Sequence, residues 1–244
     1  MDGMTKAEVA HAEGRDLAPP AKLIRPRDAA TLILIDRSGG AYRVLMGRRH
    51  ARHAFMPGKF VFPGGRTDPA DGRVVAGDEL HALEVEKLTT QSRATSRRAR
   101  AIALSAIRET YEEVGLLIGR KGSFSAPAAD WKGFAEHGVQ PSLAGLRLIA
   151  RAITPPGSVR RFDTRFFAGW RDGVAVELPD AATNELEEVV WLPLGEAQKA
   201  DVPLITRTVL EVLEARLAAD PGLQPGATVP FFRMVGSRFR RDTL

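Results

Sequence analysis

The chain has 244 residues, of which 44% are hydrophobic, so it is long enough to bury the core of one domain with decorations, or of two domains at most. It contains no cysteine, which excludes disulfides, thiol nucleophiles and zinc sites built on cysteine. A formal net charge of +5 favours anionic ligands, a class that includes phosphorylated small molecules, nucleic acids and anionic membrane surfaces.

The beginning of the chain lacks the features of an export signal. Residues 1–22 are charged and contain a proline pair, and no stretch approaches the roughly twenty apolar residues that a membrane-spanning helix needs. We therefore expect a soluble, cytoplasmic protein that does not bind membranes. Residues 1–22 are expected to form a flexible N-terminal tail, and residues 23–244 a single domain.

The first predicted elements are strands. Two apolar runs, residues 29–35 and 42–47, flank the turn-forming sequence DRSGG and predict a β-hairpin. A short strand over residues 60–62 then leads into the sequence PGG, where the backbone must turn sharply and can offer a carbonyl oxygen to a metal ion. An ordinary turn glycine is the alternative interpretation of Gly64.

Residues 108–116, with the sequence RETYEEVGL, carry the strongest functional signal in the chain. On a helix with 100° per residue, Glu109, Glu112 and Glu113 share an arc of about 100°, whereas apolar residues occupy the opposite face. Like charges this close destabilise a helix unless a cation lies among them, and Mg²⁺ or Mn²⁺ is the natural partner of such oxygen ligands. Arg108 is placed to orient one of the carboxylates. A merely solvated acidic face is the alternative.

This pattern resembles the second half of the signature of the Nudix hydrolases, in which Gly, five residues, Glu and seven residues precede Arg-Glu-U-x-Glu-Glu-x-Gly-U, with U apolar. Thr110 stands where the family usually has an aliphatic residue. Residues 60–71, FVFPGGRTDPAD, supply the first half, with Asp71 in place of the glutamate. The seven-residue gap becomes the thirty-six residues 72–107, an insertion of 29. The arrangement resembles the branch related to the peroxisomal coenzyme A diphosphatases, and the likeness spans most of residues 28–216, although only this motif, the Nudix box, is specific.

The resemblance implies an α/β fold, namely a Nudix-type α/β/α sandwich with a mixed central sheet and a helical insertion at about residues 72–94. It also implies metal-dependent hydrolysis of a diphosphate linkage. In this chain the metal ligands would be the carboxylates of Glu109, Glu112 and Glu113 and the carbonyl oxygen of Gly64, holding one to three Mg²⁺ or Mn²⁺ ions.

The catalytic candidates are Arg108, Glu109 and Glu113. The general base differs between branches of the family, in which it is either a glutamate of the box or an acid on a loop. We take Glu109 as the hypothesis for this role, with Glu185 and Glu187 as alternatives.

Two further helices are predicted before the box ends. Residues 78–88 and 95–115 have helical spacing, and Thr95 or Ser96 is a suitable N-cap for the second. The sequence leaves open whether the insertion forms a lid or a contact within a homodimer.

The second half of the chain predicts more strands and a final helix. Residues 143–153 and 165–170 are expected to be strands, separated by a proline-containing loop. A helix is expected from about Gly195, broken near Pro203, and ending at Ala219. Residues 230–233 are expected to be ordered near the core, and the chain beyond them to be frayed.

The substrate-binding candidates are Arg49, Phe62, Gly65 and Arg161. The last belongs to an Arg-Phe-Asp-Thr segment that resembles one in the same branch, and a structural pairing of Arg161 with Asp163 or with a strand end is the alternative.

The substrate prediction comes from the coenzyme A diphosphatases, which carry an upstream Arg-Ser-x-x-x-Arg segment. Arg49 matches its first arginine, whereas Ala54 stands in place of the second. Coenzyme A or an acyl derivative is therefore the favoured substrate, and ADP-ribose and dinucleotides remain open.

Two other classes of function fit the sequence less well than hydrolysis. A Nudix-like regulator that binds a nucleotide without cleaving it is disfavoured, because such relatives typically lose carboxylates that this chain keeps. A nucleic-acid-binding protein is disfavoured because the basic residues are spread out and no aromatic platform interleaves with them.

Overall fold

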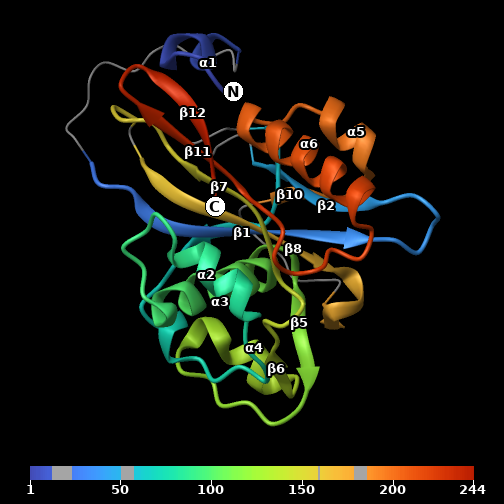
Figure 1. Ribbon diagram of the computed structural model, residues 1–244. Coiled ribbons are helices and arrows are strands. Elements are labelled where there is room, and N and C mark those ends of the chain that lie inside the picture. Colours follow the sequence, from blue (N-terminus) through green and yellow to red (C-terminus); the bar gives the residue numbers. More distant parts are fainter. Residues whose placement is uncertain (13–23, 51–57, 159, 179–185) are drawn as a thin grey trace.

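The computed structural model describes residues 1–12, 24–50, 58–158, 160–178 and 186–244, which form a nine-stranded mixed sheet with helices on both faces and a separate three-stranded sheet (Figure 1). The strands are β1 (Arg27–Asp36), β2 (Arg43–Arg49), β3 (Phe60–Val61), β4 (Gly64–Arg66), β5 (Leu116–Lys121), β6 (Val139–Pro141), β7 (Arg147–Ile153), β8 (Phe162–Trp170), β9 (Val174–Glu177), β10 (Leu186–Pro193), β11 (Pro230–Val235) and β12 (Arg238–Thr243). The helices are α1 (Lys6–Ala12), α2 (Ala82–Thr89), α3 (Ser96–Val114), α4 (Lys132–Glu136), α5 (Leu194–Lys199) and α6 (Leu204–Ala219), with short 3₁₀ turns η1 (Asp71–Arg73), η2 (Ala129–Trp131) and η3 (Arg171–Gly173).

The large sheet has the strand order β10-β2-β1-β8-β7-β11-β12, with β3 paired to β2 and β4 paired to β1. Strand β1 is parallel to β8, and β7 is parallel to β11, whereas the other neighbours are antiparallel. The prediction of an α/β fold with a mixed central sheet is therefore confirmed. None of the described helices is both long enough and apolar enough to cross a membrane.

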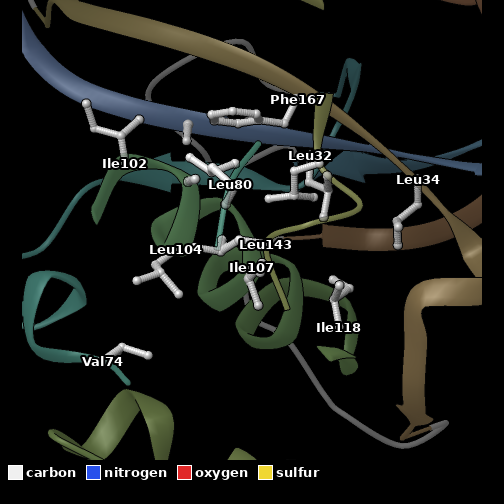
Figure 2. Close-up of a cluster of buried hydrophobic side chains, with 14 of the residues drawn as sticks. Leu32, Leu34, Val74, Leu80, Ile102, Leu104, Ile107, Ile118, Leu143 and Phe167 are labelled. Atoms are coloured by element: carbon white, nitrogen blue, oxygen red, sulfur yellow. The ribbon is translucent and has the colours of Figure 1, made fainter. Parts of the chain in front are cut away.

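Successive side chains of β1 point alternately to the two faces of the sheet. Leu32 and Leu34 belong to a buried cluster with α3, whereas Ile33 and Ile35 belong to a second cluster with α6. Figure 2 shows the first cluster, in which Phe167 of β8 lies on the same side of the sheet as the leucines of β1. Each face of the sheet therefore buries its own core, with α2, α3 and α4 on one side and α5 and α6 on the other (Figure 1).

Helix α3 begins and ends at the signals that the sequence predicts. The Thr95 side chain accepts a hydrogen bond from the Arg98 N–H at 3.2 Å, which satisfies one of the free amides of the first turn. Gly115 ends the helix with φ of 70°, a left-handed conformation that glycine adopts without steric cost. This helix carries the three acidic residues of the box.

The β-hairpin predicted around residues 36–40 is present as β1 and β2, and the late helix is present as α5 and α6, divided at Pro203. The expected helix over residues 78–88 is shorter and begins after His81, whose ring accepts a hydrogen bond from the Leu83 N–H. The strand expected from residue 143 begins at Arg147.

Both ends of the chain differ from the expectations. The prediction of a frayed C-terminus is wrong, because β12 pairs with β11 along its whole length and the Leu244 N–H donates to the Val229 carbonyl at 2.9 Å. Residues 1–12 depart from the expectation of a loose tail, because the Gly3 N–H donates to the Phe239 carbonyl and α1 buries Val9. Residues 13–22 of the predicted tail lie outside the described residues.

The predicted insertion, residues 72–94, is attached to the body of the protein by buried charge. Glu84 of α2 is fully buried and accepts hydrogen bonds from the Lys87 ammonium at 2.7 Å and from the Leu148 N–H at 2.8 Å. Burial lowers the pKa of Lys87, and the hydrogen bond that Lys87 donates to Glu84 offsets this lowering only in part. Leu80 and Leu88 add apolar side chains to the core beside α3. Contacts of this kind tie the segment to the sheet.

Replacing Glu84 by alanine should lower the free energy of unfolding by about 3–5 kcal/mol, because Lys87 would remain buried without its counter-charge. Urea denaturation of the purified variant measures this loss. Glu86→Ala provides the control, since Glu86 is exposed on the same helix and its replacement should change stability by about 0.5 kcal/mol or less. Equal stability of the two variants would contradict the anchoring role of Glu84.

Candidate functional site

The two glycines of β4 create the site by leaving room at the edge of the sheet. A Cβ atom on Gly64 would lie 2.5 Å from the Ala30 carbonyl oxygen and 2.6 Å from the Cα atom of Thr31. A Cβ atom on Gly65 would collide with the carboxylate of Glu109. Only glycine therefore allows the chain to approach both β1 and α3 at this point.

Two of the three box carboxylates lie directly against these glycines. Glu113 is buried and accepts a hydrogen bond from the Gly64 N–H at 3.1 Å, while Glu109 is in contact range of Gly65. The helical wheel correctly places the acids opposite the apolar face, because Leu104 and Ile107 are buried in the core. The acids do not simply project into solvent.

Arg108 connects α3 to the end of β4 and the segment after it through a set of charged contacts. Its guanidinium lies 2.8 Å from Asp71, 2.9 Å from Glu109 and 2.6 Å from Glu112, and it also donates to the Arg66 carbonyl at 2.9 Å. The predicted role of Arg108 in orienting a carboxylate is therefore compatible with its geometry.

Burial and charge act in opposite directions on the pKa values of this cluster. Burial lowers the pKa of Arg108, but the hydrogen bonds that it donates to Asp71 and the charges of Glu109 and Glu112 outweigh burial and raise the pKa overall. Burial raises the pKa of the Glu112 carboxyl, and the nearby guanidinium reduces that rise without cancelling it. Arg108 is therefore permanently charged.

Asp71 occupies the position of the first acid of the box and is completely buried. One carboxylate oxygen accepts from Arg108 at 2.8 Å and from the Trp131 ring N–H at 3.2 Å, and the other accepts from the Asp68 N–H at 2.8 Å. Trp131 was missed from the sequence, where no motif singles it out. The only signal available was that a buried carboxylate needs several donors.

A cavity of about 490 Å³ opens at this glycine–carboxylate cluster. The part of its lining that comes from β4 and α3 consists of Gly64, Gly65, Arg66, Glu109 and Glu113. Side chains from several other strands of the large sheet line the rest. The size falls within the range of pockets that bind small molecules. Glu112 is absent from the lining, in keeping with its pairing with Arg108.

Of the predicted substrate contacts, Arg49, Phe62 and Gly65 line the cavity and Arg161 does not. The Arg161 guanidinium instead donates to the carbonyl oxygens of Thr154 at 2.9 Å and Ile24 at 2.7 Å, which is the structural alternative of a strand-end contact.

The neighbour of Arg161, Arg160, is exposed and lines the cavity. Asp163, the other partner considered for Arg161, pairs with Arg151 at 2.7 Å and with Arg165 at 3.3 Å.

Glu185 and Glu187 are the alternative candidates for the general base. Glu185 lies outside the described residues. The Glu187 carboxylate lies 3.3 Å from the Nε2 atom of His50, and Glu187 is not among the residues that line the cavity. Of the three candidates, therefore, only Glu109 lies within the described residues and also lines the cavity.

The donor chemistry of the site fits a hard divalent ion, although the described residues contain no group of three or more acidic or histidine side chains already arranged around a metal position. Two carboxylates, those of Glu109 and Glu113, line one cavity beside the backbone of Gly64. Mg²⁺ is commonly held by one or two carboxylates together with phosphate oxygens of the substrate, so a complete cage of protein ligands is not required.

Replacing Asp71 by asparagine should lower the free energy of unfolding by about 3–5 kcal/mol, since the buried guanidinium of Arg108 would lose a charged partner. Thermal or urea unfolding of the metal-free protein provides the measurement. Asp130→Asn is the matched control, because Asp130 lies beside Trp131 in η2 but is exposed. A loss no greater than that of the control would show that Asp71 does not hold the cluster together.

Comparison with solved structures shows which known proteins this chain resembles. No protein-family model matches the chain. A NUDIX hydrolase from Alicyclobacillus acidocaldarius is 28% identical, covers 82% of this chain and 94% of its own, and superimposes with a TM-score of 0.61. The NUDIX domain of Shewanella oneidensis NrtR, complexed with ADP ribose, is 13% identical, with coverage of 88% and 99% and a TM-score of 0.47.

A Nudix hydrolase from M. smegmatis is 14% identical, with coverage of 91% and 97% and a TM-score of 0.44. Nudix hydrolases generally use divalent metal ions. The mixed sheet and the likeness to the A. acidocaldarius protein show that the chain has the fold of the Nudix hydrolases, and this likeness supports a Nudix hydrolase enzyme.

Proposed function

We propose that this enzyme hydrolyses the diphosphate linkage of a nucleoside diphosphate derivative with the help of Mg²⁺ or Mn²⁺, and that coenzyme A or an acyl-coenzyme A is its substrate. The observation that carries the proposal is the placement of Glu109 and Glu113 in one cavity with the cationic side chains of Arg49 and Arg160. Carboxylates suit a divalent cation, and arginines suit phosphate oxygens.

In this proposal the carboxylates of Glu109, Glu112 and Glu113 and the carbonyl oxygen of Gly64 hold the metal. A bound divalent ion would neutralise charge on the diphosphate and act as a Lewis acid toward it. Glu112 joins this set only if its carboxylate leaves Arg108, with which it now pairs at 2.6 Å. Glu109 and Glu113 therefore form the core of the set.

The protein side chains have distinct tasks in the reaction. Glu109 accepts the proton of the attacking water, since it is a carboxylate that lines the cavity beside Gly65. Glu113 is oriented by the Gly64 N–H, and Arg108 acts by positioning Glu109 and does not line the cavity itself. Residues 23–244 form the single catalytic domain, with residues 72–94 as its insertion.

The phosphate contacts are assigned to the arginines of the cavity. We assign Arg160 in place of Arg161, since Arg160 lines the cavity whereas Arg161 is engaged by two backbone carbonyls. Phe62 and Gly65 complete the substrate contacts near the carboxylates.

The test is turnover of a substrate panel by the purified protein with Mg²⁺ or Mn²⁺, resolved by chromatography. The panel contains coenzyme A, an acyl-coenzyme A, ADP-ribose, NADH and dinucleoside polyphosphates. Release of 4′-phosphopantetheine and 3′,5′-ADP from coenzyme A is the expected result. Cleavage of another member alone would keep the chemistry and change the substrate, while binding without metal-dependent cleavage would favour a regulator that senses a nucleotide.

Glu113→Gln should reduce kcat by about a thousandfold or more while the protein stays folded, because the amide keeps an oxygen for the Gly64 N–H but loses the charge that a metal requires. Rates at saturating metal and circular dichroism measure the two effects. Glu211→Gln is the control, since Glu211 is exposed on α6 and outside the cavity lining. A fully active Glu113→Gln enzyme would contradict the assignment of Glu113 as a metal ligand.

Arg160→Gln should raise KM about tenfold with little change in stability, because an exposed guanidinium that contacts phosphate contributes about 1.5 kcal/mol. Arg161→Gln should behave in the opposite way, with lower stability and a smaller change in KM, because it loses its bonds to Thr154 and Ile24. Steady-state kinetics and thermal unfolding of both variants separate the two roles. The reverse pattern would return the phosphate contact to Arg161.

A further inference from the structure

The cavity continues far beyond the carboxylates, across the large sheet. Strand pairing aligns one row of lining residues from β4 through β1, β8 and β7 to β11. In order, the row is Arg66, Ala29, Thr164, Ala152 and Phe232. Neighbouring strands lie about 4.8 Å apart, so the row extends for about 19 Å from the glycine edge.

The middle of this row is a trough, because its side chains are small. Ala29, Thr164 and Ala152 are in register on three adjacent strands and form the floor. Phe162 and Phe166 lie two residues to either side of Thr164, on the same face of β8, and both line the cavity. An extended group can therefore pass between the two rings over the small side chains.

The far end of the trough is closed by the two ends of the chain. Helix α1 lies beside β12 at the top of Figure 1, where the Gly3 N–H donates to the Phe239 carbonyl at 2.9 Å and the Phe239 N–H donates to the Met4 carbonyl at 2.8 Å. The lining side chains from α1, β11 and β12 are Val9, Phe232 and Phe239, which are 7%, 2% and 2% exposed. These three apolar side chains form the end wall.

We propose that the cavity selects diphosphates that carry an extended chain with an apolar end, and that Val9, Phe232 and Phe239 bind that end. The assignment of the other end rests on the proposed function, because the diphosphate must lie beside Glu109 and Glu113. A ligand with a hydroxylated sugar at the far end would bury hydroxyl groups against these three side chains, which have no hydrogen-bonding atoms. Burial of two methylene groups there already favours an apolar end by about tenfold.

Coenzyme A and octanoyl-coenzyme A are suitable probes, since they share the diphosphate and differ only at the far end. Their affinities are measured calorimetrically without metal, and kcat/KM is then measured for both with Mg²⁺. We expect the wild type to favour octanoyl-coenzyme A by tenfold or more. Val9→Gln should reduce this preference to about twofold, because it places an amide in the apolar wall.

Ala152→Leu is a second variant that leaves the end wall intact and fills the floor of the trough, and it should reduce the preference in the same way. Val235→Gln is the control, since Val235 is 44% exposed on β11 and does not line the cavity. Its preference should match that of the wild type. If both cavity variants keep the full preference, the end wall is not the binding site.

The outcomes separate this inference from the proposed function. Equal affinity of the wild type for both probes, or failure of octanoyl-coenzyme A to bind, would overturn the inference even if coenzyme A is cleaved. Tighter binding of octanoyl-coenzyme A that depends on Val9 and Ala152, without cleavage of either probe, would support the inference and refute the hydrolytic role.

Discussion

The position of the buried Arg108 guanidinium governs the rest of the site. It joins α3 to the chain just after β4 through Asp71, and it holds Glu109 and Glu112 on its own helix. Because four charges are packed into a partly desolvated volume, each depends on the others, and removing one leaves the remainder unbalanced. Trp131 adds a neutral donor to Asp71 and brings η2 into the same network.

Neighbouring carboxylates on one helix acquire different roles through this arrangement. Glu112 faces the guanidinium and leaves the cavity lining, whereas Glu113 faces the Gly64 N–H and enters it. Glu109 contacts both the cation and the cavity, so a divalent ion would compete with Arg108 for its oxygens. Such competition favours metal binding together with substrate phosphates, which add ligands of their own.

Local patterns in the sequence predict most of the fold but not the choices between adjacent residues. The limits of α3, the β1–β2 hairpin and the box glycines follow from periodicity, caps and turn residues. The distinction between Arg160 and Arg161 does not, because it depends on which side of the chain faces the cavity where β8 begins. Helix α1 has only one buried residue, Val9, and its order comes from pairing with the opposite end of the chain, which no local pattern records.

Asp71 and Arg108 are in contact although they are far apart in the sequence. Thirty-six residues, 72–107, divide Asp71 from Arg108, yet the two side chains lie 2.8 Å apart. Closing a longer loop costs only slightly more entropy than closing a short one, so the contact tolerates the intervening chain. The segment also contributes its own stabilising contacts, since Leu80 and Leu88 enter the core and Glu84 binds β7. The long intervening segment is therefore compatible with the contact between Asp71 and Arg108, which depends on how the chain folds and not on the spacing of the two residues in the sequence.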